Sequence, residues 1–250
     1  GVFGIAIATA AFPRLSRDAI HSENSHQKVA DTSVYAIKKM LFIMLPASVG
    51  LIFAGWDIVG AIFDHGRFHA EGSLSPTFRC MFCYALGLPA FAAVKIPVSA
   101  FYAQQKPKIP TLVGALVVVV NIVLIITLIK PLREAGLALA TTLSSYVNFL
   151  VLMIILAWQL KRPLFRPLLL PLVQGLLCSA LMGAALYGAG RWMPDADGRF
   201  LIYCLRLLVL LPLGMLGYFL ASWFIQKEET RVIVDAFVEK MRRRKPFASK

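Results

Sequence analysis

The hydrophobic residues of this chain are gathered into long runs separated by short polar connections. Six runs of roughly 20 residues, the length that crosses the hydrocarbon core of a bilayer as a helix, fall near 38–55, 78–103, 109–129, 135–159, 168–190 and 200–225. A lone span in lipid must satisfy its own backbone hydrogen bonds, so each run is expected to be helical. The pattern predicts an all-α, polytopic membrane helix bundle whose short hairpins make neighbouring helices antiparallel.

Shorter patterned segments flank the six spans. The opening run GVFGIAIATAAFP is too short to cross a bilayer, and we interpret it as the second half of a helix, which predicts a C-terminal fragment. At the other end, TRVIVDAFVEKMRRRK places apolar residues on one helical face before a basic cluster. This predicts an amphipathic tail held on anionic phospholipids, with a partner-binding helix as the alternative. No aromatic platform accompanies the cluster, which argues against nucleic acid.

Composition and charge support a membrane protein and give it an orientation. The chain is 58% hydrophobic, its mean hydropathy is +0.72 and its net charge is +13. Eighteen of the 26 lysines and arginines lie before the first full span, in every second connection after it and in the tail, against six in the alternate connections. The positive-inside rule then predicts a cytoplasmic C-terminus and an outward-facing 64–77 connection.

Lys95 lies in the middle of the run 78–103. A lysine at the membrane centre costs about 2.5–3.5 kcal/mol on insertion scales, so such residues usually face a polar interior or a ligand. Pro89 and Pro97 lack backbone donors and should free carbonyls near Ala85 and Ala93, as in helices that line transporter cavities. We therefore expect a polar path that accepts anions. The alternative is that the lysine reaches the inner headgroups.

Other polar residues have simpler interpretations. Asn121 and Thr141 could hydrogen-bond across one hairpin, or form a cation site without a carboxylate. Lys39 suits anchoring at the inner interface. Asp57 could cap a short helix at the outer interface. Arg206 is expected to extend outward or to pair with the loop carboxylates Asp195 and Asp197.

The cysteines and histidines do not occur in the spacings that are typical of catalytic or metal-binding motifs. Cys80 and Cys83 form a lone CxxC in an apolar run, which favours packing over metal binding. The histidines fall in predicted loops, with a weak metal alternative for the last two: His21, His26, His65 and His69. No HExxH, GxSxG or Walker sequence occurs. We expect no catalytic residue, cofactor or metal.

Four segments together resemble the MurJ/MviN family of lipid II flippases, within the multidrug/oligosaccharidyl-lipid/polysaccharide exporter superfamily. They are GVFGIAIATAAFPRLSR, FDHGRF, KIPVSAFYAQQKPKIPT and AGLALATTLSS, in order over roughly residues 1–160. The resemblance implies fourteen helices in two six-helix lobes plus two extra helices. It divides this chain into part of the second lobe (1–160), two additional transmembrane helices (161–226) and a cytoplasmic tail (227–250).

The resemblance also implies a function. The family moves undecaprenyl-diphosphate-linked disaccharide pentapeptide to the outer leaflet of the bacterial inner membrane for peptidoglycan synthesis, by alternating access through a cationic cavity. A basic residue eight positions before a Leu-Pro pair is one cavity cation, which points to Lys38, and Lys95 keeps a second expected charge. Asn121 and Thr141 match a sodium site of some relatives, with Ile125 in place of an acid. Cell-wall synthesis proteins are the implied protein partners.

Rival functions would leave different sequence features. An exporter of other polyprenyl-diphosphate-linked glycans would carry much the same sequence features as a lipid II flippase. A drug or cation antiporter should carry acids in its cavity, and this half shows none there. A membrane-bound glycosyl or phosphoryl transferase would need clustered carboxylates to hold a metal. A scaffold for cell-wall enzymes would not depend on Lys95.

Overall fold

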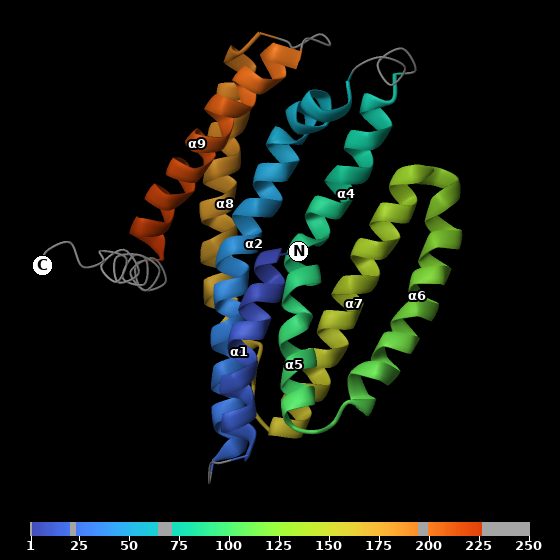
Figure 1. The fold of residues 1–250 in the computed structure, drawn as a ribbon, viewed down its shortest axis with the longest axis vertical. Coiled ribbons are helices and arrows are strands. Elements are labelled where there is room, and N and C mark those ends of the chain that lie inside the picture. The colour runs from blue at the N-terminus through green and yellow to red at the C-terminus, as the bar shows by residue number, and fades with distance from the viewer. Residues whose placement is uncertain (1, 21–23, 65–71, 195–199, 227–250) are drawn as a thin grey trace, which may run out of the picture.

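The computed structural model describes residues 2–20, 24–64, 72–194 and 200–226, and within these ranges the chain is helical apart from short connections. Long helices run side by side along the molecule (Figure 1). They are α1 (Val2–Ile20), α2 (Ser25–Phe63), α4 (Leu74–Ala93), α5 (Lys95–Ala103), α6 (Lys108–Leu132), α7 (Glu134–Leu160), α8 (Arg166–Trp192) and α9 (Phe200–Ile225). The predicted all-α class is confirmed.

The six predicted spans are also confirmed. Six stretches of the described residues are long and apolar enough to cross a bilayer: α2, α4 together with α5, α6, α7, α8 and α9. The protein is therefore a multi-pass membrane protein. Helix α2 is longer than predicted, since its 39 residues reach about 58 Å at 1.5 Å per residue. It must extend past a hydrocarbon core of about 30 Å.

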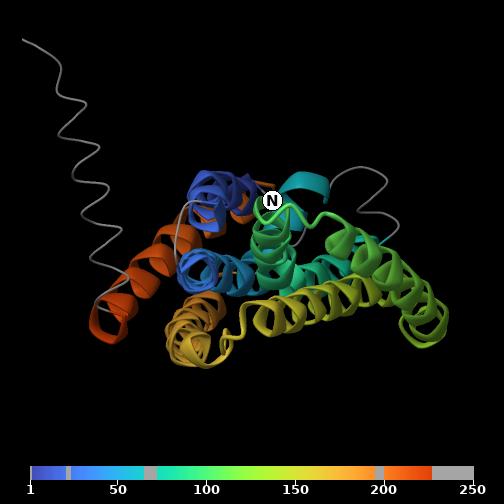
Figure 2. The ribbon, with the colours of Figure 1, turned by 90° about the horizontal axis from the view of Figure 1, so that it is seen from below.

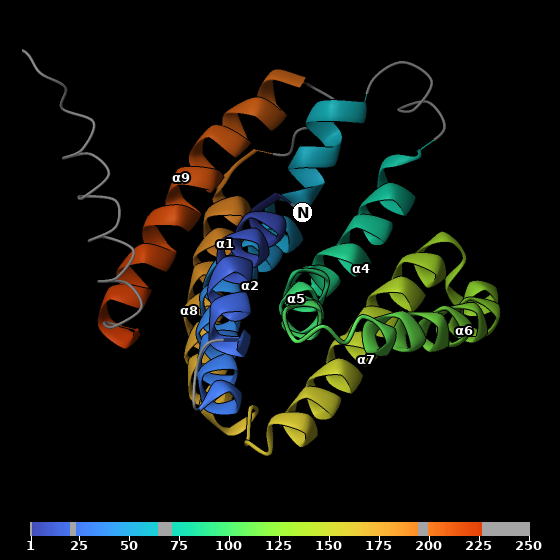
Figure 3. The same ribbon diagram turned by 60° about the horizontal axis from the view of Figure 1, so that its bottom comes forward.

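Helix α2 is the hub of the bundle. It contacts α1, α4, α5, α7, α8 and α9. Seen from below, α2 lies between the α8–α9 pair on one side and α4 with α5 on the other (Figure 2). The α6–α7 hairpin stands at the edge farthest from α9, as the tilted view also shows (Figure 3). A change in the position of α2 would therefore alter its packing against most of the other described helices.

The main core is built at the lower end of Figure 1, where residues 104–107 and 161–165 connect the helices. Its fully buried side chains come from α1, α2, α5 and α7 and include Leu15, Ile37, Ile96, Phe101 and Leu156. A smaller apolar cluster joins α8 to α9 around Met182 and Leu210. The two clusters together hold α2 on both sides.

Side chains from neighbouring helices donate hydrogen bonds to carbonyls that prolines leave without a partner in their own helix. Pro46 has no N–H to bond the carbonyl four residues earlier, and the Tyr218 hydroxyl of α9 donates to that Phe42 oxygen over 2.7 Å. Ser48 of α2 donates to the Ala85 oxygen over 2.7 Å, which Pro89 leaves free. The expectation that the Ala85 carbonyl lines a cavity is therefore wrong, because α2 packs against it.

The span that contains Lys95 is broken. Residues 74–103 divide at Val94 into α4 and α5, and Lys95 is the first residue of α5. Pro97, two residues later, cannot donate to the Ala93 carbonyl at the end of α4. The predicted interruption of this helix beside Lys95 is thus present, and it changes the helix direction where the cation lies.

The α6–α7 hairpin turns over a single residue. Arg133 separates the two helices and has φ +49°, a conformation that few residues other than glycine adopt. The helices pack closely in the first turn of α7, because a Cβ atom on Gly136 would collide with the Leu128 carbonyl of α6. Most of α6 beyond its first turns is exposed and apolar, which suits a lipid environment.

Several sequence expectations need correction. Asp57 does not cap a separate helix, because α2 continues to Phe63 and buries it. His26 lies in the first turn of α2 rather than in a loop. The other three histidines, the two loop carboxylates expected near Arg206 and the amphipathic tail lie outside the described residues.

We predict that Gly136→Ala destabilises the protein by about 1–3 kcal/mol, because the added methyl must push α6 away from α7. Gly114→Ala on α6 is the matched control: nothing lies within 4 Å of the position that its Cβ would take, so the better helix propensity of alanine should be neutral or stabilising. Thermal unfolding of the purified protein in detergent measures both. A G136A midpoint at or above that of the unmodified protein would contradict the close packing.

Candidate functional site

A cavity of about 480 Å³ lies where α1, α5 and α7 meet. Lys95 is half-buried in its wall and is the one charged residue among the described residues that line it. Helix α1 contributes Thr9 and Phe12, α5 contributes Ser99 and Tyr102 beside Lys95, and α7 contributes Asn148. Four aliphatic residues complete the wall, which is therefore mostly apolar with one cation and a few hydroxyl, amide and aromatic groups: Ile5, Ala8, Val94 and Val98.

The depth of Lys95 follows from its place in the span. Eight residues separate it from Ala103 at the lower end of the helix, a rise of about 12 Å. Its Cα therefore lies between the middle and the lower end of the 30-residue stretch Leu74–Ala103, slightly nearer the middle. Lys95 shares the cavity wall with polar side chains of α5 and α7 and with aliphatic side chains of α1 and α5.

Lys38 lies elsewhere. It is half-buried on α2, eight residues before Pro46, and is not among the residues that line the Lys95 cavity. Its neighbour Lys39 lies over the ring of Tyr35 at 5.5 Å, and Arg14 of α1 approaches the same ring at 5.9 Å. The structure thus gives a basic region on α1 and α2 that is separate from the Lys95 cavity.

Asn121 and Thr141 lie on packed helices but do not bond each other. Asn121 donates its amide to the Ser144 hydroxyl over 2.9 Å, and Ser144 donates to the Thr141 carbonyl. The Thr141 hydroxyl donates to the Leu137 carbonyl over 3.0 Å. The expected hydrogen bond between Asn121 and Thr141 is therefore wrong, and Ser144 makes the bond between α6 and α7 instead. Within the described ranges, no three His, Cys, Asp or Glu residues gather to hold a metal.

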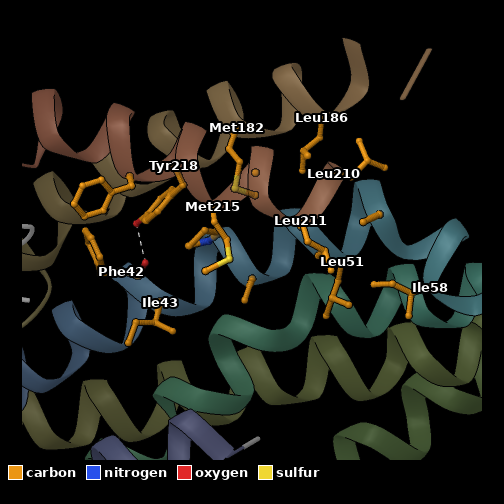
Figure 4. A pocket seen from close by; sticks show the side chains of 16 residues that line it. Phe42, Ile43, Leu51, Ile58, Met182, Leu186, Leu210, Leu211, Met215 and Tyr218 are labelled. Atoms are coloured by element: carbon orange, nitrogen blue, oxygen red, sulfur yellow. Dashed lines mark hydrogen bonds between the residues drawn. The ribbon is translucent and has the colours of Figure 1, made fainter. Parts of the chain in front are cut away.

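An apolar groove of about 460 Å³ runs between α2, α8 and α9. Figure 4 shows side chains from the three helices around it, with Met182 and Leu186 on one side and Ile43 and Leu51 on another. Tyr218 brings a hydroxyl to the lining, and the dashed line marks its bond to the Phe42 carbonyl. The groove offers apolar surface for an acyl or prenyl chain.

A buried ion pair joins α2 to α9 near the upper end of Figure 1. Arg206 Nε lies 3.0 Å from Asp57 Oδ1, and the two side chains are 16% and 2% exposed. The same arginine donates to the Pro194 carbonyl over 3.1 Å. One turn away, the Tyr203 hydroxyl donates to Asp64 over 2.8 Å. The expected outward extension of Arg206 is wrong, because the unbroken α2 carries a carboxylate to it.

The sequence analysis missed Asn148. Its Oδ1 atom is buried and has no hydrogen-bond partner in the structure, although it lies beside the cavity that contains Lys95. A signal was available, since Asn148 is an amide within an apolar run, seven residues and two helical turns after Thr141. Nothing in the sequence, however, shows that this position of α7 faces α5.

Known proteins resemble this chain over most of its length. A family model described as "Lipid II flippase MurJ" matches residues 1–222. A probable lipid II flippase MurJ of Rhizobium meliloti is 33% identical, over 77% of this chain and 36% of the relative. One from Rhizobium tropici is 31% identical over 90% of this chain and 42% of the relative, and one from Vibrio cholerae is 29% identical over 89% and 41%.

A solved structure supports the fold. A lipid II flippase MurJ in an inward closed conformation superposes with a TM-score of 0.66 at 24% identity, covering 91% of this chain and 44% of that one. The chain thus spans about two fifths of the length of the curated relatives that it matches.

We predict that Arg206→Met lowers the thermal midpoint of the protein strongly. It leaves the Asp57 carboxylate buried without its partner, which typically costs about 3–5 kcal/mol. Adding Asp57→Asn should recover part of the loss, because the unpaired charge is then removed. Arg191→Met is the matched control, since that exposed side chain donates to the Tyr187 hydroxyl on its own helix and to no other described residue. Equal midpoints for R206M and R191M would show that the pair does not hold α9 to α2.

Proposed function

Because this chain belongs to the lipid II flippase MurJ family, we propose that it forms part of a flippase that moves a lipid-linked peptidoglycan precursor to the outer leaflet by alternating access. The cargo is undecaprenyl-diphosphate-linked disaccharide pentapeptide. Transport makes and breaks no covalent bond. Each helix contribution described here would therefore act by binding cargo or by changing position.

The observation that carries the proposal is the half-buried Lys95 in a cavity that no described carboxylate lines. A diphosphate that leaves bulk water needs compensating positive charge, and two unit charges 4 Å apart attract by about 4 kcal/mol at an effective dielectric constant of 20. Lys95 would supply part of this compensation, and Lys38 would act at a second point of the path. A drug or cation antiporter would favour acids, and the buried Asp57 is already paired with Arg206.

The prenyl tail of the cargo has a different requirement. It is apolar and can stay in lipid while the headgroup crosses. The groove between α2, α8 and α9 has an almost wholly apolar lining, and we propose that the tail lies along it. The headgroup cavity and this groove are both built on helices that contact α2, so one helix connects the two parts of the binding surface.

The location of the protein follows from the same proposal. We place it in the bacterial cytoplasmic membrane with its C-terminus in the cytoplasm, which the distribution of lysines and arginines supports. The basic tail would contact anionic phospholipids at about 1 kcal/mol per basic residue near the surface. Proteins of cell-wall synthesis are the partners that this role would require.

We predict that Lys38→Ala and Lys95→Ala, each in the full-length protein, reduce the outward appearance of lipid II. A hydrogen bond to a charged group contributes about 1.5–3 kcal/mol, so headgroup binding should weaken by about ten- to a hundredfold. A leaflet-accessibility assay for lipid II measures the effect, with membrane abundance checked in parallel.

Lys130→Ala is the matched control, because that lysine is exposed in the last turn of α6 and far from both proposed contacts. Normal flipping in K38A and K95A alike would remove the basic-path mechanism. If growth also remained normal, a scaffolding role would be favoured.

A further inference from the structure

Two polar contacts join α9 to α2 near the upper end of Figure 1. Arg206 forms an ion pair with the buried Asp57, and the Tyr203 hydroxyl donates to Asp64 at the end of α2. The Tyr203 ring lies so close to Gly60 of α2 that a Cβ atom at that glycine would collide with it. The two helices are therefore held in close contact at this end of the bundle.

A third polar contact joins the same two helices farther down. The Tyr218 hydroxyl donates to the Phe42 carbonyl over 2.7 Å, and the two rings meet edge to face with their centroids 5.3 Å apart. Arg206 and Tyr218 are twelve residues apart on α9, which is a rise of about 18 Å. The upper and lower contacts are therefore about three helical turns from each other.

The apolar groove between α2, α8 and α9 occupies the interval between the upper and lower contacts (Figure 4). Its lining runs from Phe42 to Ile58 on α2 and from Leu210 to Phe219 on α9. Both stretches also contain a proline, which removes one backbone hydrogen bond from each helix: Pro46 in α2 and Pro212 in α9. The helices are thus joined above and below the groove and separated along it.

Polar contacts matter for this spacing because lipid supplies no hydrophobic force between helices. Transmembrane helices associate through close packing and hydrogen bonds instead. More than half of the residues of α9 are exposed, and all of the exposed ones are apolar, so these faces give no preference for one distance from α2 over another. The contacts that fix α9 above and below the groove therefore set its width.

We propose that Arg206, Tyr203 and Tyr218 are positioning residues for the prenyl tail, because their contacts with α2 hold α9 at the distance at which the groove accepts the chain. This rests on the proposed flippase function and on the tail position proposed with it. A site whose walls are already in place binds more tightly, since binding does not have to order them. Arg206 and Tyr203 do not line the groove, so they act on the tail only through the position of α9.

The test compares two lipids that share one headgroup: lipid II with its undecaprenyl tail and a lipid II analogue with the much shorter farnesyl tail. Binding is measured with the full-length protein in detergent. Tyr218→Phe removes the lower hydrogen bond and keeps the ring, and the double change Asp57→Leu with Arg206→Met replaces the ion pair by apolar side chains. Each should weaken lipid II binding about tenfold and leave binding of the farnesyl analogue unchanged.

Tyr187→Phe is the matched control. It also removes only a hydroxyl, which accepts a hydrogen bond from Arg191 of its own helix, and Tyr187 does not line the groove. Y187F should bind both lipids as the unmodified protein does. Thermal unfolding without lipid is measured in parallel. Replacing both members of a buried ion pair by apolar residues often leaves stability unchanged or raises it, so the double variant separates the position of α9 from loss of the fold.

Each other outcome overturns the proposal. Equal loss of both lipids in Y218F and in the double variant would show that the contacts only support the fold. Normal lipid II binding in either variant would show that the contact it lacks does not position the groove, while the flippase function stays intact. Equal affinity of the unmodified protein for the two lipids would show that the tail gains nothing from the groove.

Two further results are provided for. Should the double variant fail to accumulate, Tyr203→Phe takes its place, because it removes the hydrogen bond to Asp64 and keeps the ring against Gly60. It is judged by the same ratio of the two affinities. If the unmodified protein binds neither lipid, the proposed function itself fails, and the positioning of the tail fails with it.

Discussion

Backbone hydrogen bonding in lipid is the constraint on which the rest of this structure depends. Several of the membrane helices contain a proline, and a proline within a helix leaves a carbonyl that lipid cannot satisfy. The Tyr218 hydroxyl occupies the carbonyl freed in α2, and Ser48 of α2 occupies one freed in α4. The freed carbonyls are therefore also points at which neighbouring helices are attached, and α2 takes part in both attachments.

The same requirement separates structural polar groups from those available for function. Asp57 and Arg206 neutralise each other, and Asn121 is bonded to Ser144, so these groups stabilise packing. Lys95 lies instead on a cavity that no described carboxylate lines. A charge within a membrane carries an energetic cost, which is the physical reason to connect Lys95 with cargo.

The two candidate binding surfaces differ in chemistry as the two ends of a prenyl diphosphate glycan do. The cavity of α1, α5 and α7 carries one cation and several polar side chains among aliphatic ones, and the groove of α2, α8 and α9 is almost wholly apolar. Helix α2 contacts helices of both. A change in the angle of α2 at Pro46 would alter both surfaces together, which is the coupling that alternating access requires of a protein whose cargo keeps its tail in lipid.

The sequence by itself determined the number and type of the spans. The length of an apolar run is a local property, and it decides whether the run can cross the hydrocarbon core of a bilayer as a helix. It also indicated the interruption beside Lys95, since proline acts on its own helix. Only the tertiary structure decided which polar groups meet. Tyr218 bonds a carbonyl 176 residues away, and Tyr203 bonds a carboxylate 139 residues away. Such pairs depend on the rotation and contacts of whole helices. For the same reason, the sequence alone did not indicate the pair of Asp57 and Arg206.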